Sequence, residues 1–125
     1  MAIELANKGY DVWLTNSRGS KYSRRHIRYD ADKDPEFWNF SFIEMGQFDL
    51  PAFVDHILDR TGKEKLTYVG HSMGTTSMIY ALATNEDYYK DRINLNVQLA
   101  PVASLTNTKS LFLKFIVKQG YTVYD

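Results

Sequence analysis

The chain has 125 residues, of which 44% are hydrophobic and 24% are charged. Its 15 basic and 15 acidic residues cancel, so no overall field steers the chain to nucleic acid or to an anionic membrane. It contains no cysteine, which excludes disulfides and thiolate zinc sites, and no apolar run long enough to span a bilayer. This composition is typical of one globular domain with a packed core.

The first half of the chain predicts a helix, a strand and a long loop. Residues 1–8 are typical of an amphipathic helix that ends at Gly9, and residues 10–14 are rich in the aromatic and branched side chains of strands. Residues 20–36 are charged and aperiodic, which predicts a surface loop. A cluster of aromatic side chains follows between residues 37 and 48.

The next predicted element is an amphipathic helix. Asp49 is well placed to cap it, and Pro51 falls in the first turn, where its missing N–H is tolerated. Phe53, Val54, Ile57 and Leu58 then share one helical face, and Gly62 marks the end of the helix. We therefore expect this face to pack on the core.

The second half of the chain alternates strands with a helix. Residues 65–69 predict a strand, residues 72–83 a helix that buries Met78, Ile79 and Leu82, and residues 94–99 a further strand. Strands that alternate with helices favour an α/β fold, in which crossover helices connect parallel strands.

Residues 70–74 read Gly-His-Ser-Met-Gly and match the G-x-S-x-G pattern at a strand-to-helix turn. In such a nucleophile elbow the serine, here Ser72, occupies a strained backbone conformation that exposes its hydroxyl. Gly70 and Gly74 leave room where strand and helix cross, and the N–H of Met73 can serve as one oxyanion donor. The alternative is that both glycines are ordinary turn residues and Ser72 merely caps the helix.

No general base or acid can be assigned from the sequence. His71 is adjacent to Ser72 and is expected to point away from it, while His26 and His56 are expected at the surface. No histidine follows Ser72, as the triad order serine, acid, histidine requires. The acids after Ser72 read as loop or terminal charges; they include Asp87, Asp91 and Asp125. No metal-ligand spacing is present, and no cofactor is expected.

From residue 5 to about residue 114 the chain resembles the acid lipase family of α/β-hydrolases. Blocks that carry the resemblance are Gly-Tyr-Asp-Val-Trp-Leu at 9–14, Asn-Ser-Arg-Gly at 16–19, Tyr-Ser-Arg-Arg-His at 22–26, Glu-Phe-Trp-Asn-Phe-Ser-Phe at 36–42, Asp-Leu-Pro-Ala at 49–52, Gly-His-Ser at 70–72 and Leu-Ala-Pro-Val-Ala at 99–103. Met73 departs from the family, which usually has glutamine there, but the backbone donor is unaffected.

The resemblance implies a serine ester hydrolase that acts on triacylglycerols or sterol esters through an acyl-enzyme on Ser72. It also implies a partial α/β-hydrolase core at residues 1–105 and the start of a cap at 106–125. The family's catalytic Asp and His, a His-Gly oxyanion loop and the strand between residues 10–14 and 66–69 are not in this chain. We therefore expect a central fragment that folds poorly and is inactive alone.

The expected partners are a neutral lipid ester and, transiently, a lipid surface, with no nucleic acid. A lysosomal or secreted location is implied by the resemblance only. The alternative function is that of a non-catalytic short form that binds lipid or a protein partner.

Overall fold

The computed structural model describes residues 1–105 and 108–111. Most of the region predicted to begin a cap domain, at 106–125, therefore lies outside the described residues, as does Asp125.

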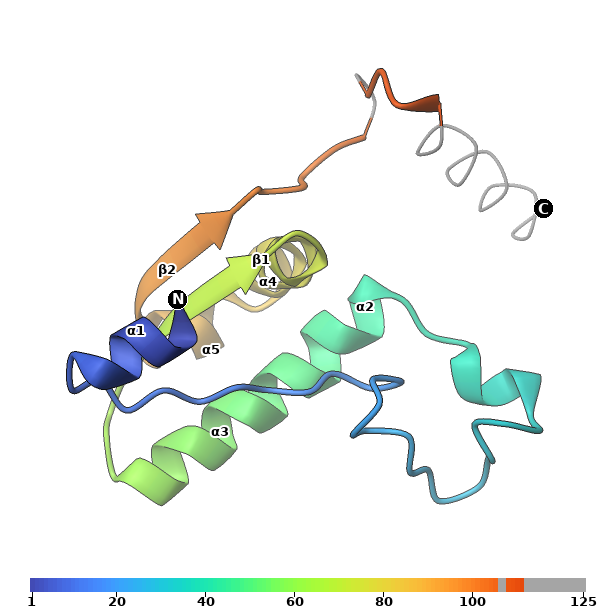
Figure 1. The fold of residues 1–125 in the computed structure, drawn as a ribbon, viewed down its shortest axis with the longest axis horizontal. Coiled ribbons are helices and arrows are strands. Elements are labelled where there is room, and N and C mark those ends of the chain that lie inside the picture. The colour runs from blue at the N-terminus through green and yellow to red at the C-terminus, as the bar shows by residue number, and fades with distance from the viewer. Residues whose placement is uncertain (106–107, 112–125) are drawn as a thin grey trace.

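The centre of the fold is a two-stranded sheet made of β1 (Leu66–His71) and β2 (Ile93–Leu99). The strands are parallel, with Tyr68 opposite Asn96 and His71 opposite Leu99. The crossover between them consists of α4 (Met73–Thr84) and α5 (Glu86–Lys90), visible behind the sheet in Figure 1. The predicted α/β arrangement of parallel strands joined by helices is thus confirmed, as a partial fold.

One face of this sheet packs on helices and the other faces solvent. Along β1, Leu66 and Tyr68 are half-buried and Gly70 is buried, whereas Thr67 and Val69 on the other face are exposed. The helices α3 (Leu50–Thr61), α4 and α5 meet under the covered face. The buried cluster there consists of Leu50, Val54, Met78, Ala81 and Tyr89. The alternation along β1 therefore follows from its period of two.

The prediction of a strand at residues 10–14 is wrong. After α1 (Ala2–Asn7) and Gly9, whose φ is +89°, these residues run along α3 in the opposite direction, and no strand of the described residues pairs with them. The Trp13 ring lies edge-on to His56 of α3, with centroids 5.9 Å apart. A strand exists only through hydrogen bonds to a neighbour, so strand-forming side chains alone do not produce one.

The prediction that Asp49 caps a helix is also wrong, because the helical segment begins earlier. Ser41 starts α2 (Phe42–Glu44) with a capping box: its hydroxyl accepts from the Ile43 N–H at 3.1 Å, and the Glu44 carboxylate accepts from the Ser41 N–H at 2.7 Å. The chain then passes through a single π-helical stretch, η2 (Met45–Asp49), directly into α3.

The π-helical stretch has a physical cause in the proline that follows it. Pro51, at the second position of α3, has no N–H to donate, and its ring would clash with a carbonyl in the preceding α-helical turn. The wider turn accommodates both effects. At the other end of α3, Gly62 adopts a φ of +65° and its N–H bonds to the Leu58 carbonyl, as predicted.

The long loop predicted at residues 20–36 is confirmed up to residue 34, and the prediction is wrong for its last two residues, which begin a short 3-10 helix, η1 (Pro35–Trp38). Asp87, predicted to be a loop charge, instead lies in α5, where its side chain is exposed and pairs with Lys90. Asp91 follows that helix as its C-cap residue. Helix α5 was not predicted because its five residues are too short for a periodic pattern.

Candidate active site

Ser72 lies between the last residue of β1 and the first residue of α4. Its φ of 52° and ψ of −117° fall outside the regions that non-glycine residues normally adopt. The Ser72 N–H donates to the Leu99 carbonyl at 3.1 Å, so the turn is fastened to the neighbouring strand. Its side chain makes no cap hydrogen bond to α4. The alternative that Ser72 is an ordinary helix cap therefore has no support in the geometry.

The two glycines of the turn differ in how tightly they are enclosed. A Cβ on Gly70 would lie 2.8 Å from Cε1 of Tyr68 and 3.1 Å from the Gly74 carbonyl carbon. A Cβ on Gly74 would meet nothing closer than the Tyr68 hydroxyl at 3.4 Å. The expectation that both positions exclude a side chain is correct for Gly70 and wrong for Gly74, where the crossing is wider.

Tyr68 also holds the turn in place, a role that was not predicted from the sequence. Its hydroxyl donates to the Gly74 carbonyl at 2.9 Å, and its ring occupies the space beside Gly70. Burial raises the pKa of the Tyr68 phenol, so it remains a neutral donor. A tyrosine two residues before the first glycine shares its face of the strand, which is the signal that could have identified it.

The other side of the turn is fastened to the chain that follows β2. The Val102 N–H donates to the Thr75 hydroxyl at 2.9 Å, and the Thr76 hydroxyl donates to the Val102 carbonyl at 2.8 Å. Thr75 also donates to the Ser72 carbonyl at 2.5 Å. Ala100, the residue after β2, has a φ of 47°, so the chain bends sharply there as well.

The electrostatics at Ser72 favour negative charge. Met73 is the first residue of α4, and the N–H groups of the first helical turn have no partner within the helix. They and the helix dipole point towards the turn that carries Ser72. An oxyanion formed next to the serine would therefore meet donors from this helix end, of which the Met73 N–H is the first.

A small cavity of about 190 Å³ lies beside the turn. Its walls come from β1, from the start of α4 and from the η2–α3 segment. Thr15 and Ser17 complete them; they belong to residues 10–17, which run along α3 and which we call the extended segment. His71 and Met73, the two neighbours of Ser72, both line it. The cavity is thus bounded by segments far apart in the sequence.

An ion pair holds the extended segment against this cavity. The Arg18 guanidinium contacts Oδ1 of Asp49 through Nε at 2.8 Å and Nη2 at 2.7 Å, and the Arg18 N–H donates to Oδ2 at 2.9 Å. The Asp49 side chain is only 11% exposed. Arg18 also lies over the rings of Phe40 and Phe48. This pair positions the residues that precede it, including Ser17.

The structure brings none of the three histidines to the serine as a hydrogen-bonded base. His56 lies against Trp13, and Nδ1 of His26 accepts N–H donors from Arg28 at 3.1 Å and Tyr29 at 3.0 Å. His71 is exposed on β1. In residues 1–105 and 108–111, no hydrogen bond joins the Ser72 hydroxyl to an imidazole or a carboxylate.

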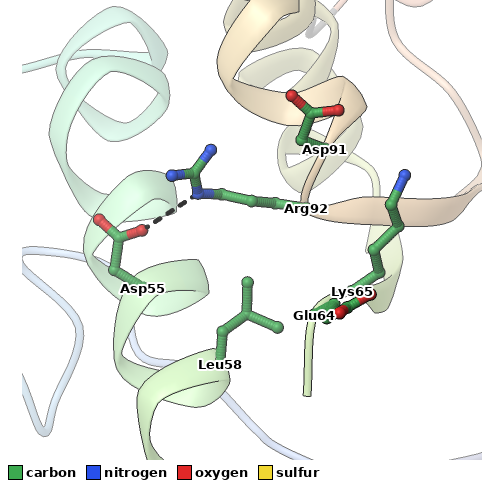
Figure 2. Close-up of a pocket in the computed structure, with 6 residues that line it drawn as sticks. All are labelled: Asp55, Leu58, Glu64, Lys65, Asp91 and Arg92. Carbon is green, nitrogen blue, oxygen red and sulfur yellow. Dashed lines mark ion pairs between the residues drawn. The ribbon is translucent and has the colours of Figure 1, made fainter. Parts of the chain in front are cut away.

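A larger depression, of about 700 Å³, lies at the opposite end of the strands, where β1 and β2 begin. Figure 2 shows that Asp55 of α3 reaches towards Arg92, which precedes β2, across this depression; their Oδ1 and Nε are 3.6 Å apart. Tyr88 donates to the same Asp55 carboxylate at 2.6 Å, and Arg92 stacks on the Tyr88 ring. These contacts tie α3 to α5 and β2, and no serine, threonine or cysteine is among the residues that line the depression.

The described part of the chain contains neither a candidate metal site nor a candidate membrane-spanning helix. There, no group of three or more histidine or acidic side chains is placed to hold a metal ion. No helix in those residues is long and apolar enough to cross a bilayer.

Comparison with known proteins identifies the family to which the chain belongs. The model of the alpha/beta hydrolase fold family matches residues 1–123. Human gastric triacylglycerol lipase is 51% identical over 114 residues, which cover 91% of this chain and 28% of the lipase. Mouse lipase member K is 49% identical over 110 residues, covering 88% and 27%, and a probable lipase of Schizosaccharomyces pombe is 49% identical over 114 residues, covering 91% and 25%.

The chain thus spans about a quarter of the length of the curated relatives it matches. The similarity includes the strand, turn and helix around Ser72, because it extends over most of the chain. The chain therefore belongs to the α/β-hydrolase fold family, and within it to the acid lipases that its sequence resembles.

Proposed function

We propose that this chain is the part of a lipase that carries the nucleophile, with Ser72 attacking the carbonyl carbon of a triacylglycerol or sterol ester. The observation that carries the proposal is the backbone of Ser72, whose φ of 52° and ψ of −117° present an exposed hydroxyl at the N-terminus of α4. A helix cap would need no such strain.

The reaction would proceed in two steps. Attack by the Ser72 oxygen forms a tetrahedral intermediate whose oxyanion is stabilised by the Met73 N–H. Collapse of the intermediate expels the alcohol and leaves an acyl-enzyme, which water then hydrolyses to release the fatty acid. Gly70 and Tyr68 hold the turn, and Thr75 fixes it to the chain after β2.

The general base, its acid partner and a second oxyanion donor belong to residues outside this chain. This part of the proposal is supported by the environment of the three histidines, which form no hydrogen bond with Ser72 in the described residues. By resemblance we also infer a lysosomal or secreted location for the enzyme.

The test is a pair of variants in a longer polypeptide that contains these residues. Ser72→Ala is expected to lower the rate of triolein hydrolysis by on the order of 10⁴-fold or more, because no other group replaces the nucleophile. Lys63→Ala, exposed after the end of α3, is the control and should leave the rate unchanged. A Ser72→Ala variant that keeps its rate would overturn the proposal.

A second experiment separates the enzyme from a non-catalytic lipid-binding module. It compares active-site labelling of the 125-residue chain with that of the longer polypeptide. A fluorophosphonate should label Ser72 in the longer polypeptide and not in the chain alone. Turnover of a p-nitrophenyl ester by the chain alone, abolished by Ser72→Ala, would contradict the location of the base outside it. Absence of labelling in both would favour the binding module.

A further inference from the structure

The loop between Arg18 and Phe40 extends away from the two strands and has a defined inner side (Figure 1). Phe37 is buried within it, and the rings of Trp38 and Phe40 pack edge-on against the Phe37 ring. The Trp38 Nε1–H donates to the Ala31 carbonyl at 3.0 Å, and Arg24 lies over the Trp38 ring while pairing with Asp32. This aromatic frame fixes the shape of the loop.

The outer side of the loop, residues 21–29, exposes large apolar side chains. We call this segment the basic tip. Ile27 is 92% exposed and Tyr22 is 78% exposed. Tyr29 stacks on His26, whose Nδ1 accepts two backbone N–H groups, so the turn that presents Ile27 is itself ordered. The tip therefore presents an aliphatic and an aromatic side chain to solvent from an ordered turn.

The basic tip is also positively charged. It contains four cationic residues and no acidic one. Arg24 is paired, but Lys21, Arg25 and Arg28 form no ion pair with any described residue. The acids that follow are partly neutralised, since Asp30 pairs with Lys33 and Asp32 with Arg24. The chain as a whole has no net charge, but this segment forms a local cationic surface.

We infer that the basic tip docks on an anionic lipid surface, with Ile27 and Tyr22 at the boundary between headgroups and acyl chains and Lys21, Arg25 and Arg28 against phosphate. Nucleic acid would satisfy the cations and stack on Tyr22, but it would leave Ile27 in water. The choice of a lipid rests partly on the proposed lipase function, yet docking does not involve Ser72, so the two can fail separately.

The first experiment uses the absence of cysteine in the chain. Ile27→Cys labelled with an environment-sensitive fluorophore reports insertion, and Lys63→Cys, exposed beyond the far end of α3, is the matched control. With phosphatidylcholine vesicles that contain phosphatidylserine, the label at 27 should shift to the blue and be quenched by a lipid-borne quencher. The label at 63 should do neither. Equal responses at both positions, or none, would overturn the inference.

Charge variants test the electrostatic part. Each cation near such a surface contributes about fivefold to partitioning, so replacing Lys21, Arg25 and Arg28 by Gln should weaken vesicle binding about a hundredfold at low salt. Replacing Lys8, Arg60 and Lys63 by Gln removes the same charge elsewhere and should change binding by less than about threefold. Asp34→Asn with Glu36→Gln, next to the tip, should strengthen binding.

Two further outcomes separate the partners and the proposals. Binding to single-stranded RNA without a blue shift at position 27 on vesicles would assign the tip to nucleic acid and overturn the inference. The Ser72→Ala chain should bind vesicles as the unmodified chain does. In the longer polypeptide, Ser72→Ala should abolish hydrolysis and keep vesicle binding, which supports the inference separately from the proposed function. Hydrolysis by the unmodified polypeptide without any vesicle binding would overturn the inference alone.

Discussion

Two regions of this molecule carry equally strong strand-forming side chains, yet only one of them forms strands. Residues 66–102 contain β1, the turn at Ser72, α4, α5 and β2, and they satisfy one another through the β1–β2 ladder and through the bonds to Val102. Residues 10–17 have similar side chains but lie against α3 and are held by Arg18 and Trp13.

The difference shows which contacts each region needs in order to adopt its structure. The bonds described above that hold the turn at Ser72 all lie within residues 68–102, so its geometry needs no hydrogen bond from residues 10–17. A strand depends on a partner that is remote in the sequence. The predictions below test whether the region around Ser72 is as self-sufficient as this comparison indicates.

The largest expected effect comes from filling the space beside the turn. Gly70→Ala should destabilise the fold by about 3 kcal/mol, because its Cβ would overlap the Tyr68 ring and the backbone of Gly74. Gly74→Ala is the control: it has room and lies in a helix, so it should change stability by less than about 1 kcal/mol. Urea unfolding measures both, and equal losses would contradict the asymmetry.

The second prediction concerns the core under the sheet at alkaline pH. Burial raises the pKa of Tyr89 to about 12 from its ordinary value of 10. The unfolded chain releases this proton first, so the stability due to neutral Tyr89 is complete below pH 10 and declines as the pH rises towards 12. One such group lowers the free energy of unfolding by about 1.4 kcal/mol per pH unit in this window.

Tyr89→Phe isolates this contribution from the other groups that titrate at high pH. The variant loses only a long hydrogen bond, 3.5 Å from the Tyr89 hydroxyl to the Gly46 carbonyl. The difference in unfolding free energy between the two proteins should therefore change between pH 9 and pH 12 in favour of the variant. A constant difference would show that Tyr89 titrates normally in the folded chain.

The third prediction concerns the ion pair that holds the extended segment, residues 10–17. Arg18→Ala leaves the nearly buried Asp49 carboxylate without its partner and should cost about 2 kcal/mol. Lys90→Ala breaks an ion pair whose Asp87 side chain is 90% exposed and should cost less than about 0.5 kcal/mol. Hydrogen exchange should show faster opening at residues 15–18 in the Arg18 variant while the amides of β1 and β2 stay protected.

The smallest effect is a gain. Ser72→Gly should raise the free energy of unfolding by about 1 kcal/mol, because glycine adopts a φ of 52° with little strain. The same change removes the proposed nucleophile, so stability and hydrolysis should move in opposite directions. A loss of stability in this variant would show that the backbone at Ser72 is relaxed.

Local patterns predicted much of this fold because their physical causes are local. The glycine after α3, the strand before Gly70 and the helix after Ser72 depend on residues a few positions apart. Asp49 could not be predicted as the partner of Arg18, since the pair closes over 31 positions and replaces the expected cap. The support that Tyr68 gives to Gly74 needed the crossing of strand and helix to be seen.

The bonds between Val102 and the threonines at 75 and 76 have a mechanical consequence. They fasten the chain to the first turn of α4 directly after the bend at Ala100. A movement or a pulling force applied to the chain after Val102 must break these bonds before it reaches Ser72. Insertions and rearrangements downstream of this anchor are therefore insulated from the nucleophile, and that segment can vary without displacing the serine.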